Sequence, residues 1–205
     1  EYNNKLKNEQ KQIEKEMTKI AEKISKIRKE NAEELNKKIN KELEDLEMKN
    51  AKINVKVEYK IEQFFEDGKD QVEIFIKTNV GENENKLTQI ASGGEMSRIM
   101  LAIKKVLAEV DKMPIMIFDE IDTGISGKAA KSVASKLKSI SLNHQVLCIS
   151  HLAPIAAIAD YNYFISKKVE NERTSTEVKL LNEQEVLCEI ARISSGEINE
   201  VTLQY

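Results

Sequence analysis

The chain has 205 residues, of which 33% are charged, and its 32 Lys and Arg nearly balance its 35 Asp and Glu to leave a formal net charge of −3. This balance excludes a whole-chain electrostatic attraction to nucleic acid, so any DNA contact has to be local. The length is sufficient for one or two domains with a sizeable hydrophobic core.

Cysteine usage and hydropathy indicate an intracellular protein. Cys148 lies in an apolar run and Cys188 in a predicted helix, and these two residues do not form the disulfide framework typical of a secreted domain. No apolar stretch approaches the roughly 20 residues that cross a bilayer, and no signal-peptide pattern opens the chain. We therefore expect a soluble, cytoplasmic protein with no membrane partner. Because the chain begins at Glu1 rather than Met, we also expect it to be a fragment or a processed form.

Residues 1–50 predict one long polar helix, because they contain no Gly or Pro and are dominated by Lys, Glu, Asn and Gln. Their apolar residues lie alternately three and four apart, which is typical of a coiled-coil seam. The seam consists of Leu6, Ile13, Met17, Ile20, Ile24 and Ile27 and, after a break at Asn31, of Leu35, Ile39, Leu43 and Leu46. We predict a coiled-coil arm whose seam needs a partner helix. An amphipathic helix folded onto the rest of the same chain is the alternative.

The apolar period then changes to two, which predicts a β-hairpin. Alternation runs from Ile53 to Tyr59 and from Val72 to Ile76, on either side of a turn at residues 66–69. Further along, apolar strands alternate with amphipathic helices, a pattern typical of a parallel α/β sheet. The predicted elements are a helix after residue 95 that reaches Val110, a strand after Pro114, a helix over 128–141, a strand over 146–149, strands at 163–165 and 176–181, and a helix over 183–194.

Two carboxylates follow the strand that begins after Pro114. Asp119 and Glu120 come directly after apolar residues 115–118, so they are expected at the carboxyl edge of the sheet, where ligands bind in open α/β folds. There Asp119 can hold Mg²⁺ or its water shell, and Glu120 can polarise an attacking water. An isolated pair of this kind is more often a helix cap or a solvated turn. The neighbouring motifs favour the catalytic interpretation.

The segment Ser92-Gly93-Gly94-Glu95 stands immediately before a predicted helix. The free N–H groups and the positive dipole end of such a helix make an anion site, and the glycines allow a ligand to approach closely. The same residues also fit an ordinary helix start, with Ser92 as the N-cap and Glu95 in the first turn. Arg98 can bind a phosphate or form an ion pair with a carboxylate.

The pair Ser150-His151 follows the second buried strand, at the same predicted sheet edge as Glu120. The imidazole of His151 can bond a γ-phosphate or position the attacking water, although a single His after a strand is more often structural. Asp122-Thr123-Gly124 is a turn-forming segment directly after this carboxylate region. His144 lies in a polar loop and is predicted to be on the surface.

A phosphate-binding loop requires Gly, four further residues and then Gly-Lys-Ser/Thr, and the chain contains no such motif. The Gly127-Lys128 pair has Asp122 where the first glycine should be and Ala129 where the hydroxyl residue should be. The chain therefore carries pieces of a nucleotide-hydrolysing site, and we expect the missing loop upstream of it.

Three segments taken together resemble the C-terminal half of the RecN family of bacterial DNA repair ATPases, which belongs to the SMC-like branch of ABC ATPases. These segments are residues 91–98, 117–127 and 149–152. The resemblance covers essentially the whole chain. It implies a coiled-coil arm over residues 1–50 and, over residues 51–205, the C-terminal lobe of an ABC-type ATPase head, which is an α/β fold with a mostly parallel sheet flanked by helices.

The resemblance also implies roles and partners. Ser92 to Glu95 is the ABC signature, Asp119 and Glu120 form Walker B with Glu120 as the general base, Asp122 to Gly124 lie in the D-loop, and His151 is the switch histidine. In the family, two heads of a homodimer sandwich ATP and Mg²⁺ between the Walker A loop of one head and the signature of the other. Walker A belongs to the N-terminal half of the head, the arm pairs with an antiparallel helix, and the assembly acts on DNA at the nucleoid.

Two alternatives stay open on the sequence. The chain can be the half-head of another SMC-like or Rad50-like ATPase, or a non-catalytic coiled-coil interaction module with a degenerate lobe. On the leading interpretation, the chain by itself is expected to be inactive as an ATPase because it lacks Walker A.

Overall fold

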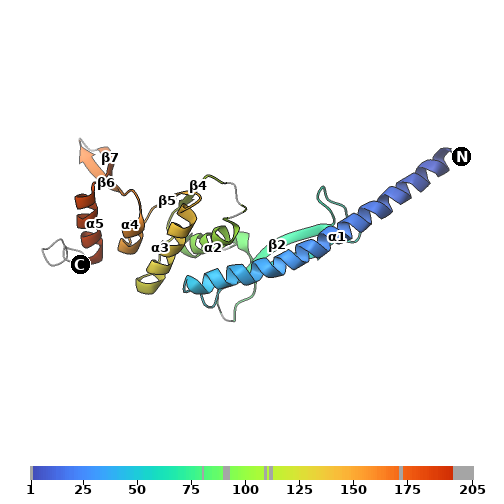
Figure 1. Ribbon diagram of the computed structural model, residues 1–205, viewed down its shortest axis with the longest axis horizontal. Coiled ribbons are helices and arrows are strands. Elements are labelled where there is room, and N and C mark those ends of the chain that lie inside the picture. The colour runs from blue at the N-terminus through green and yellow to red at the C-terminus, as the bar shows by residue number, and fades with distance from the viewer. Residues whose placement is uncertain are drawn as a thin grey trace. The chain divides into compact units, whose positions relative to one another are not determined.

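The computed structural model describes residues 2–79, 81–89, 93–108, 110, 113–170 and 173–195 (Figure 1). The chain divides into two compact units, the first of residues 1–44 and 48–90 and the second of residues 45–47 and 91–205. Among the described residues, no helix is both long enough and apolar enough to span a membrane.

The first unit combines a long helix with an antiparallel sheet. Its elements are helix α1 (Tyr2–Asp45), strands β1 (Lys52–Tyr59), β2 (Asp70–Lys77) and β3 (Asn85–Lys86), and a 3-10 helix (Leu87–Gln89). β1 and β2 form a hairpin in which Ile53 lies opposite Ile76 and Tyr59 lies opposite Asp70. The predicted helix and hairpin are thus confirmed. The short strand β3, which pairs with β2, has no counterpart in the sequence pattern.

Two asparagines of α1 hydrogen-bond backbone groups on the edge of β1 that does not pair with β2. Asn40 accepts a hydrogen bond from the N–H of Ile53 (2.8 Å) and donates one to the carbonyl of the same residue (2.9 Å). Asn36, one turn earlier, accepts a bond from the N–H of Val55 (2.7 Å). A strand edge with unpaired polar groups is costly to bury and prone to wrong pairing. These side chains therefore fix the hairpin along the second half of α1.

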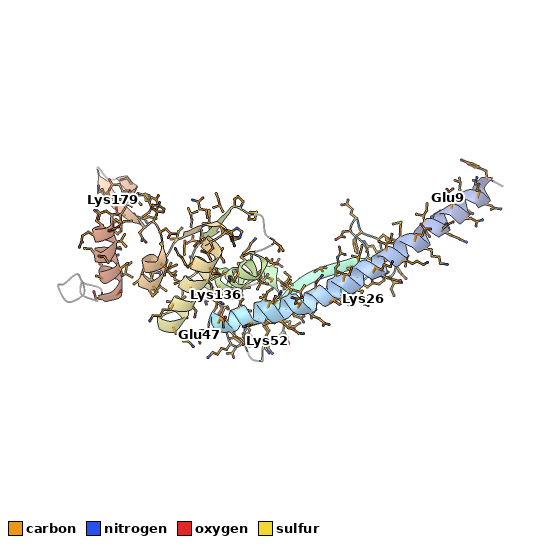
Figure 2. All side chains as sticks on the ribbon, viewed as in Figure 1. Glu9, Lys26, Glu47, Lys52, Lys136 and Lys179 are labelled. Atoms are coloured by element: carbon orange, nitrogen blue, oxygen red, sulfur yellow. The ribbon has the colours of Figure 1, made fainter. Side chains whose placement is uncertain are left out.

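The apolar seam predicted along α1 divides into two parts. Residues 2–17 are all exposed (Figure 2), and seam residues Ile13, Met17, Ile20 and Ile27 expose between 44% and 58% of their surface. The later seam residues Ile39, Leu43 and Leu46 are each at most 1% exposed, and Leu35 is half-buried. The small residues Ala21, Ser25 and Ala32 of α1 are buried as well. Folding onto the same chain, the alternative interpretation, therefore describes the second half of α1.

The second unit contains the parallel strands. Helix α2 (Gly93–Leu107), strand β4 (Ile115–Phe118), helix α3 (Gly127–Ser141) and strand β5 (Gln145–Cys148) alternate along the chain. β4 and β5 pair in parallel, which confirms the predicted sheet. One face of the pair turns Met116 and Phe118 into the core, whereas the other exposes Ile115, Ile117 and Leu147 by 47%, 69% and 46%.

The remaining elements are helix α4 (Ala153–Ile158), strands β6 (Tyr163–Glu170) and β7 (Arg173–Leu180), which pair antiparallel, and helix α5 (Glu183–Ser195). Helix α5 begins with a capping box, in which Asn182 accepts a bond from the N–H of Glu185 (2.9 Å) and Glu185 accepts one from the N–H of Asn182 (3.1 Å). The strands and α5 were predicted. Helix α4 was not, because its six residues are too few to display a period.

Two predictions about this unit are wrong. Helix α2 ends at Leu107, and Val110, predicted to extend its apolar face, is 73% exposed. His144, predicted to lie on the surface, is only 8% exposed. Its Nδ1 lies 2.7 Å from the carbonyl oxygen of Met113 and its Nε2 lies 3.2 Å from that of Ala108. The imidazole therefore ties the loop before β5 to the segment before β4.

Replacing His144 with Ala is expected to lower the free energy of unfolding by about 1–3 kcal/mol, because a partly buried carbonyl loses its donor and the ring leaves a void. Chemical denaturation measures this change. The neighbouring Asn143 is exposed, so Asn143→Ala should stay within about 0.5 kcal/mol of the wild type. Equal losses for both variants would contradict the structural role of His144.

Candidate functional site

The chain turns sharply where the two candidate carboxylates follow β4. Asp119 and Glu120 come directly after Phe118, and both are exposed. Glu120 has a φ of 56°, in the left-handed region that residues other than glycine rarely adopt. Its N–H donates to Oδ1 of Asp119 (2.9 Å). Strained backbone of this kind concentrates at functional sites, and here it ends the strand at the residue expected to be the base.

The start of α2 packs directly against this turn. A methyl group at Gly93 would lie 2.5 Å from Oε2 of Glu120, and one at Gly94 would lie 2.8 Å from Cβ of Thr123. At both positions only glycine permits the approach without displacing a neighbour. The two predicted motifs, the glycine pair and the Asp-Glu pair, therefore meet within one site.

Two further side chains of α2 hold the loop after β4. The hydroxyl of Ser97 donates to the carbonyl of Asp119 (2.8 Å). Nη1 of Arg98 donates to the carbonyl of Thr123 (2.7 Å), and the residue is only 7% exposed. Burial lowers the pKa of Arg98, and the charge of Glu95 in the same helical turn partly opposes this shift. The arginine thus bonds a backbone carbonyl, a role that neither sequence hypothesis for it included.

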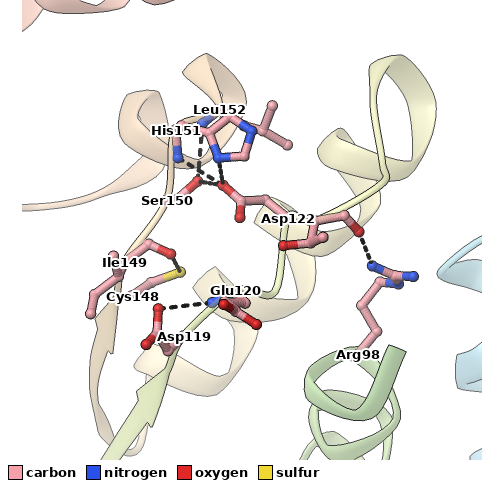
Figure 3. Close-up of polar contacts among 10 residues, drawn as sticks. Arg98, Asp119, Glu120, Asp122, Cys148, Ile149, Ser150, His151 and Leu152 are labelled. Carbon is pink, nitrogen blue, oxygen red and sulfur yellow. Dashed lines mark hydrogen bonds and ion pairs between the residues drawn. The ribbon is translucent and has the colours of Figure 1, made fainter. Parts of the chain in front are cut away.

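Asp122 connects this loop to the segment after β5 (Figure 3). Its side chain is 4% exposed, and its Oδ2 accepts bonds from the hydroxyl of Ser150 (2.6 Å) and from the N–H of His151 (2.7 Å). Nδ1 of His151 lies 3.0 Å from the same oxygen, while the His151 side chain is 75% exposed. Gly124 follows with a φ of 73°, which only glycine adopts without strain.

Cys148, the last residue of β5, is a half-buried free thiol. Burial raises its pKa to about 12, with the charges of Asp122 and Asp119 acting in the same direction. Since the thiolate is the nucleophilic form, Cys148 does not contribute a nucleophile. Cys188 is also a half-buried free thiol.

The structure thus brings together most of the predicted site residues, namely Gly93, Gly94, Asp119, Glu120, Asp122, Thr123, Gly124 and His151. Glu95 lies in the first turn of α2. Ser92 lies outside the described residues, so its prediction is untested. Sequence reasoning missed the contacts of Ser97, Arg98 and Ser150. Serine and arginine at these positions carried no pattern that distinguishes a buried contact from a solvated one.

The carboxylates described at this site are too few to form a metal cage, but they suit a magnesium ion whose other ligands come from a nucleotide. In the described part of the chain, no three His, Cys, Asp or Glu side chains cluster as a metal cage. Mg²⁺ usually binds through one or two carboxylates together with substrate phosphates and water. The exposed carboxylate of Asp119, whose Oδ1 accepts the N–H of Glu120, has the chemistry of such a ligand.

Comparison with solved structures defines the class of fold. An SMC head domain with an extended coiled coil from Pyrococcus furiosus superposes with a TM-score of 0.57 at 20% identity, over 94% of this chain and 46% of that one. An SMC head with a coiled coil and joint from Pyrococcus yayanosii gives 0.55 at 22% identity, over 93% and 36%. The chain therefore has the fold of part of an SMC head domain, in agreement with the predicted fold class.

Sequence comparison narrows this class, although no family model matches the chain. The DNA repair protein RecN of Halalkalibacterium halodurans is 42% identical over 182 residues, which are 87% of this chain and 32% of that protein. The RecN of Bacillus subtilis is 44% identical over 144 residues, or 70% and 25%. The chain belongs to the RecN family, and it spans between 25% and 32% of the length of these relatives.

Proposed function

We propose that this chain is one lobe of an SMC-like ATPase head that acts in recombinational repair of DNA double-strand breaks. The lobe supplies the ABC signature, the Walker B carboxylates and the switch histidine to a homodimer in which two heads sandwich ATP. Walker A lies outside the chain, in the N-terminal half of the same head. The RecN relatives support the assignment to repair, and the SMC heads support the fold.

The observation that carries this proposal is the direct contact among the motifs. Gly94 lies against Thr123, and Asp122 beside it bonds Ser150 and His151. Each motif alone has a simple structural explanation, as a helix start, a turn or a structural histidine. None of these explanations requires the motifs to meet, whereas a composite nucleotide site does.

Each group has one task in the proposed reaction. Glu120 accepts a proton from the attacking water, and His151 contacts that water or the γ-phosphate. Asp119 holds Mg²⁺, directly or through water, and the bound ion neutralises charge on the phosphates. The N–H groups at Gly93 and Gly94 and the positive end of α2 face the nucleotide of the second head, to which Ser92 donates its hydroxyl.

Two uncovered apolar surfaces support the proposed partners. β4 and β5 expose Ile115, Ile117 and Leu147 on a face that parallel sheets normally bury, and we assign this face to the N-terminal half of the head. The exposed seam from Ile13 to Ile27 on α1 is assigned to an antiparallel partner helix. We propose residues 1–50 as the arm and 51–205 as the head lobe of a cytoplasmic, nucleoid-associated protein that acts on DNA.

A non-catalytic interaction module is the second candidate. The exposed seam of α1 favours it, because such a seam mediates assembly whether or not the lobe hydrolyses ATP. The two candidates differ in whether the signature residues affect an ATP-dependent step.

The purified chain of residues 1–205 is expected neither to bind ATP tightly nor to hydrolyse it. It lacks the Walker A loop, which supplies most contacts to the phosphates. Calorimetric titration and phosphate release measure these two properties. Addition of the N-terminal half of the parent protein should restore turnover, and Glu120→Gln should remove the restored activity. Robust turnover by the chain alone, unchanged by Glu120→Gln, would refute the assignment.

A further inference from the structure

A buried carboxylate outside the assigned catalytic groups holds the histidine segment in place. The Asp122 side chain is 4% exposed, and its Oδ2 receives the hydroxyl of Ser150 at 2.6 Å and the N–H of His151 at 2.7 Å. Ser150 also accepts a bond from the N–H of Leu152 (3.1 Å). A desolvated carboxylate is tolerated only where donors surround it, so the segment from Ser150 to Leu152 is built around Asp122.

The same carboxylate orients the imidazole. Nδ1 of His151 lies 3.0 Å from Oδ2 of Asp122 (Figure 3), and a carboxylate at this distance favours the tautomer that carries its proton on Nδ1. In the neutral ring, Nε2 is then a free acceptor, and the ring is 75% exposed. The contact thus selects one tautomer and one ring orientation, as the aspartate of a catalytic triad does.

The loop that contains Asp122 is itself fixed on α2. Arg98 donates to the carbonyl of Thr123 (2.7 Å), and Ser97 donates to that of Asp119 (2.8 Å). Gly94 leaves no space between the helix and Thr123. The loop is therefore bonded to α2 on both sides of Asp122, at Asp119 and at Thr123.

We propose that Asp122 is a positioning residue that acts through His151, by setting its tautomer and orientation within the same chain. This inference rests on the proposed function, since it assigns the ring a task in ATP hydrolysis. Asp122 touches neither the nucleotide nor the attacking water in this role. When Nδ1 carries the proton, Nε2 of the neutral ring is an acceptor. It can then accept a hydrogen bond from the attacking water but cannot donate one to the γ-phosphate, so His151 is assigned to positioning the water.

A double-mutant cycle in the complete parent protein tests this role. Asp122→Ala should lower kcat by about 10-fold or more, because outer partners of a functional histidine have effects of this size, and should leave KM for ATP within about two-fold of the wild type. His151→Ala should have an equal or larger effect. The double variant should be no slower than His151→Ala alone, since residues that act as a unit are not additive.

Two controls keep the result interpretable. Asp160→Ala removes an exposed carboxylate that pairs with Lys138 (2.7 Å) in the same unit and should leave kcat unchanged. If Asp122→Ala does not fold, as judged by circular dichroism, the cycle is run with Asp122→Asn, which keeps the shape of the side chain. Smaller but still non-additive losses are then expected.

The outcomes separate this inference from the function on which it rests. Normal turnover after Glu120→Gln would refute the proposed function. If Glu120→Gln abolishes turnover but the losses from Asp122→Ala and His151→Ala multiply, the positioning role is overturned while the function stands. A change confined to KM, or a His151→Ala variant with wild-type kcat, would also overturn it.

Discussion

Glu120→Gln in the complete protein is expected to lower ATP turnover by at least about 100-fold and to accumulate an ATP-bound dimer, because an amide cannot accept the proton of the attacking water. The substitution keeps the size of an exposed side chain on a backbone with a φ of 56°, so stability should not change. Steady-state phosphate release measures the turnover. Size-exclusion chromatography in ATP and Mg²⁺ measures the dimer.

The matched control for this variant is Glu177→Gln. Glu177 lies on β7, where it forms an exposed ion pair with Lys168 (2.7 Å), far in sequence from the carboxylates after β4. Removing an exposed pair changes stability by about 1 kcal/mol or less, so turnover should equal that of the wild type. If Glu120→Gln also hydrolyses ATP normally, Glu120 is not the general base.

Ser92→Arg is expected to weaken ATP-dependent dimerisation by about 100-fold, which corresponds to about 2.8 kcal/mol. In the proposed sandwich, Ser92 and the glycines after it approach a phosphate held by the second head. A long side chain at this position keeps the two surfaces apart, and the hydroxyl donor is lost. Analytical ultracentrifugation with and without ATP measures the dimerisation constant, in the Glu120→Gln background to prevent turnover.

Ser135→Arg provides the comparison, because Ser135 is exposed on α3 and belongs to none of the motifs. This variant should dimerise like its parent. The pair of variants also discriminates between the two candidate functions. Under the interaction-module hypothesis, assembly depends on the seam of α1, and Ser92→Arg should then have no more effect than the control.

The glycine, carboxylate and histidine motifs could be found in the sequence because each rests on local chemistry. Gly93-Gly94 before an amphipathic helix, and Asp119-Glu120 after four apolar residues, are patterns within a few positions of one another. The Gly127-Lys128 pair could be rejected as a phosphate loop for the same reason. The contacts that join these motifs could not be predicted, because they link residues that are distant in the chain.

His144 and Asp122 illustrate this limit. Both are polar residues in loops, and local composition predicts such residues on the surface. Each is buried against partners that are distant in the chain. His144 contacts the carbonyls of Met113 and Ala108, and Asp122 accepts bonds from Ser150 and His151. The burial of a polar residue depends on its hydrogen-bond partners. When these partners are distant in the chain, local sequence contains no signal that the residue is buried.

The long helix shows the same division. The absence of Gly and Pro and the spacing of its apolar residues determined that residues 2–45 form one helix. Only the tertiary structure showed which face is buried: Asn36 and Asn40 bond the edge of β1, and Ala32, Ile39 and Leu43 of the same helix are buried.

The sequence by itself therefore determined the order of the helices and strands other than β3 and α4, the parallel pairing and the identity of the candidate catalytic groups. Secondary structure and motif chemistry depend on neighbours along the chain, which the sequence displays directly. Only the tertiary structure decided how the groups are held: the strained turn at Glu120, the close approach of Gly93 and Gly94, and the burial of Asp122 beneath His151. These features depend on packing and desolvation between distant segments, and those energies exist only once the chain has folded.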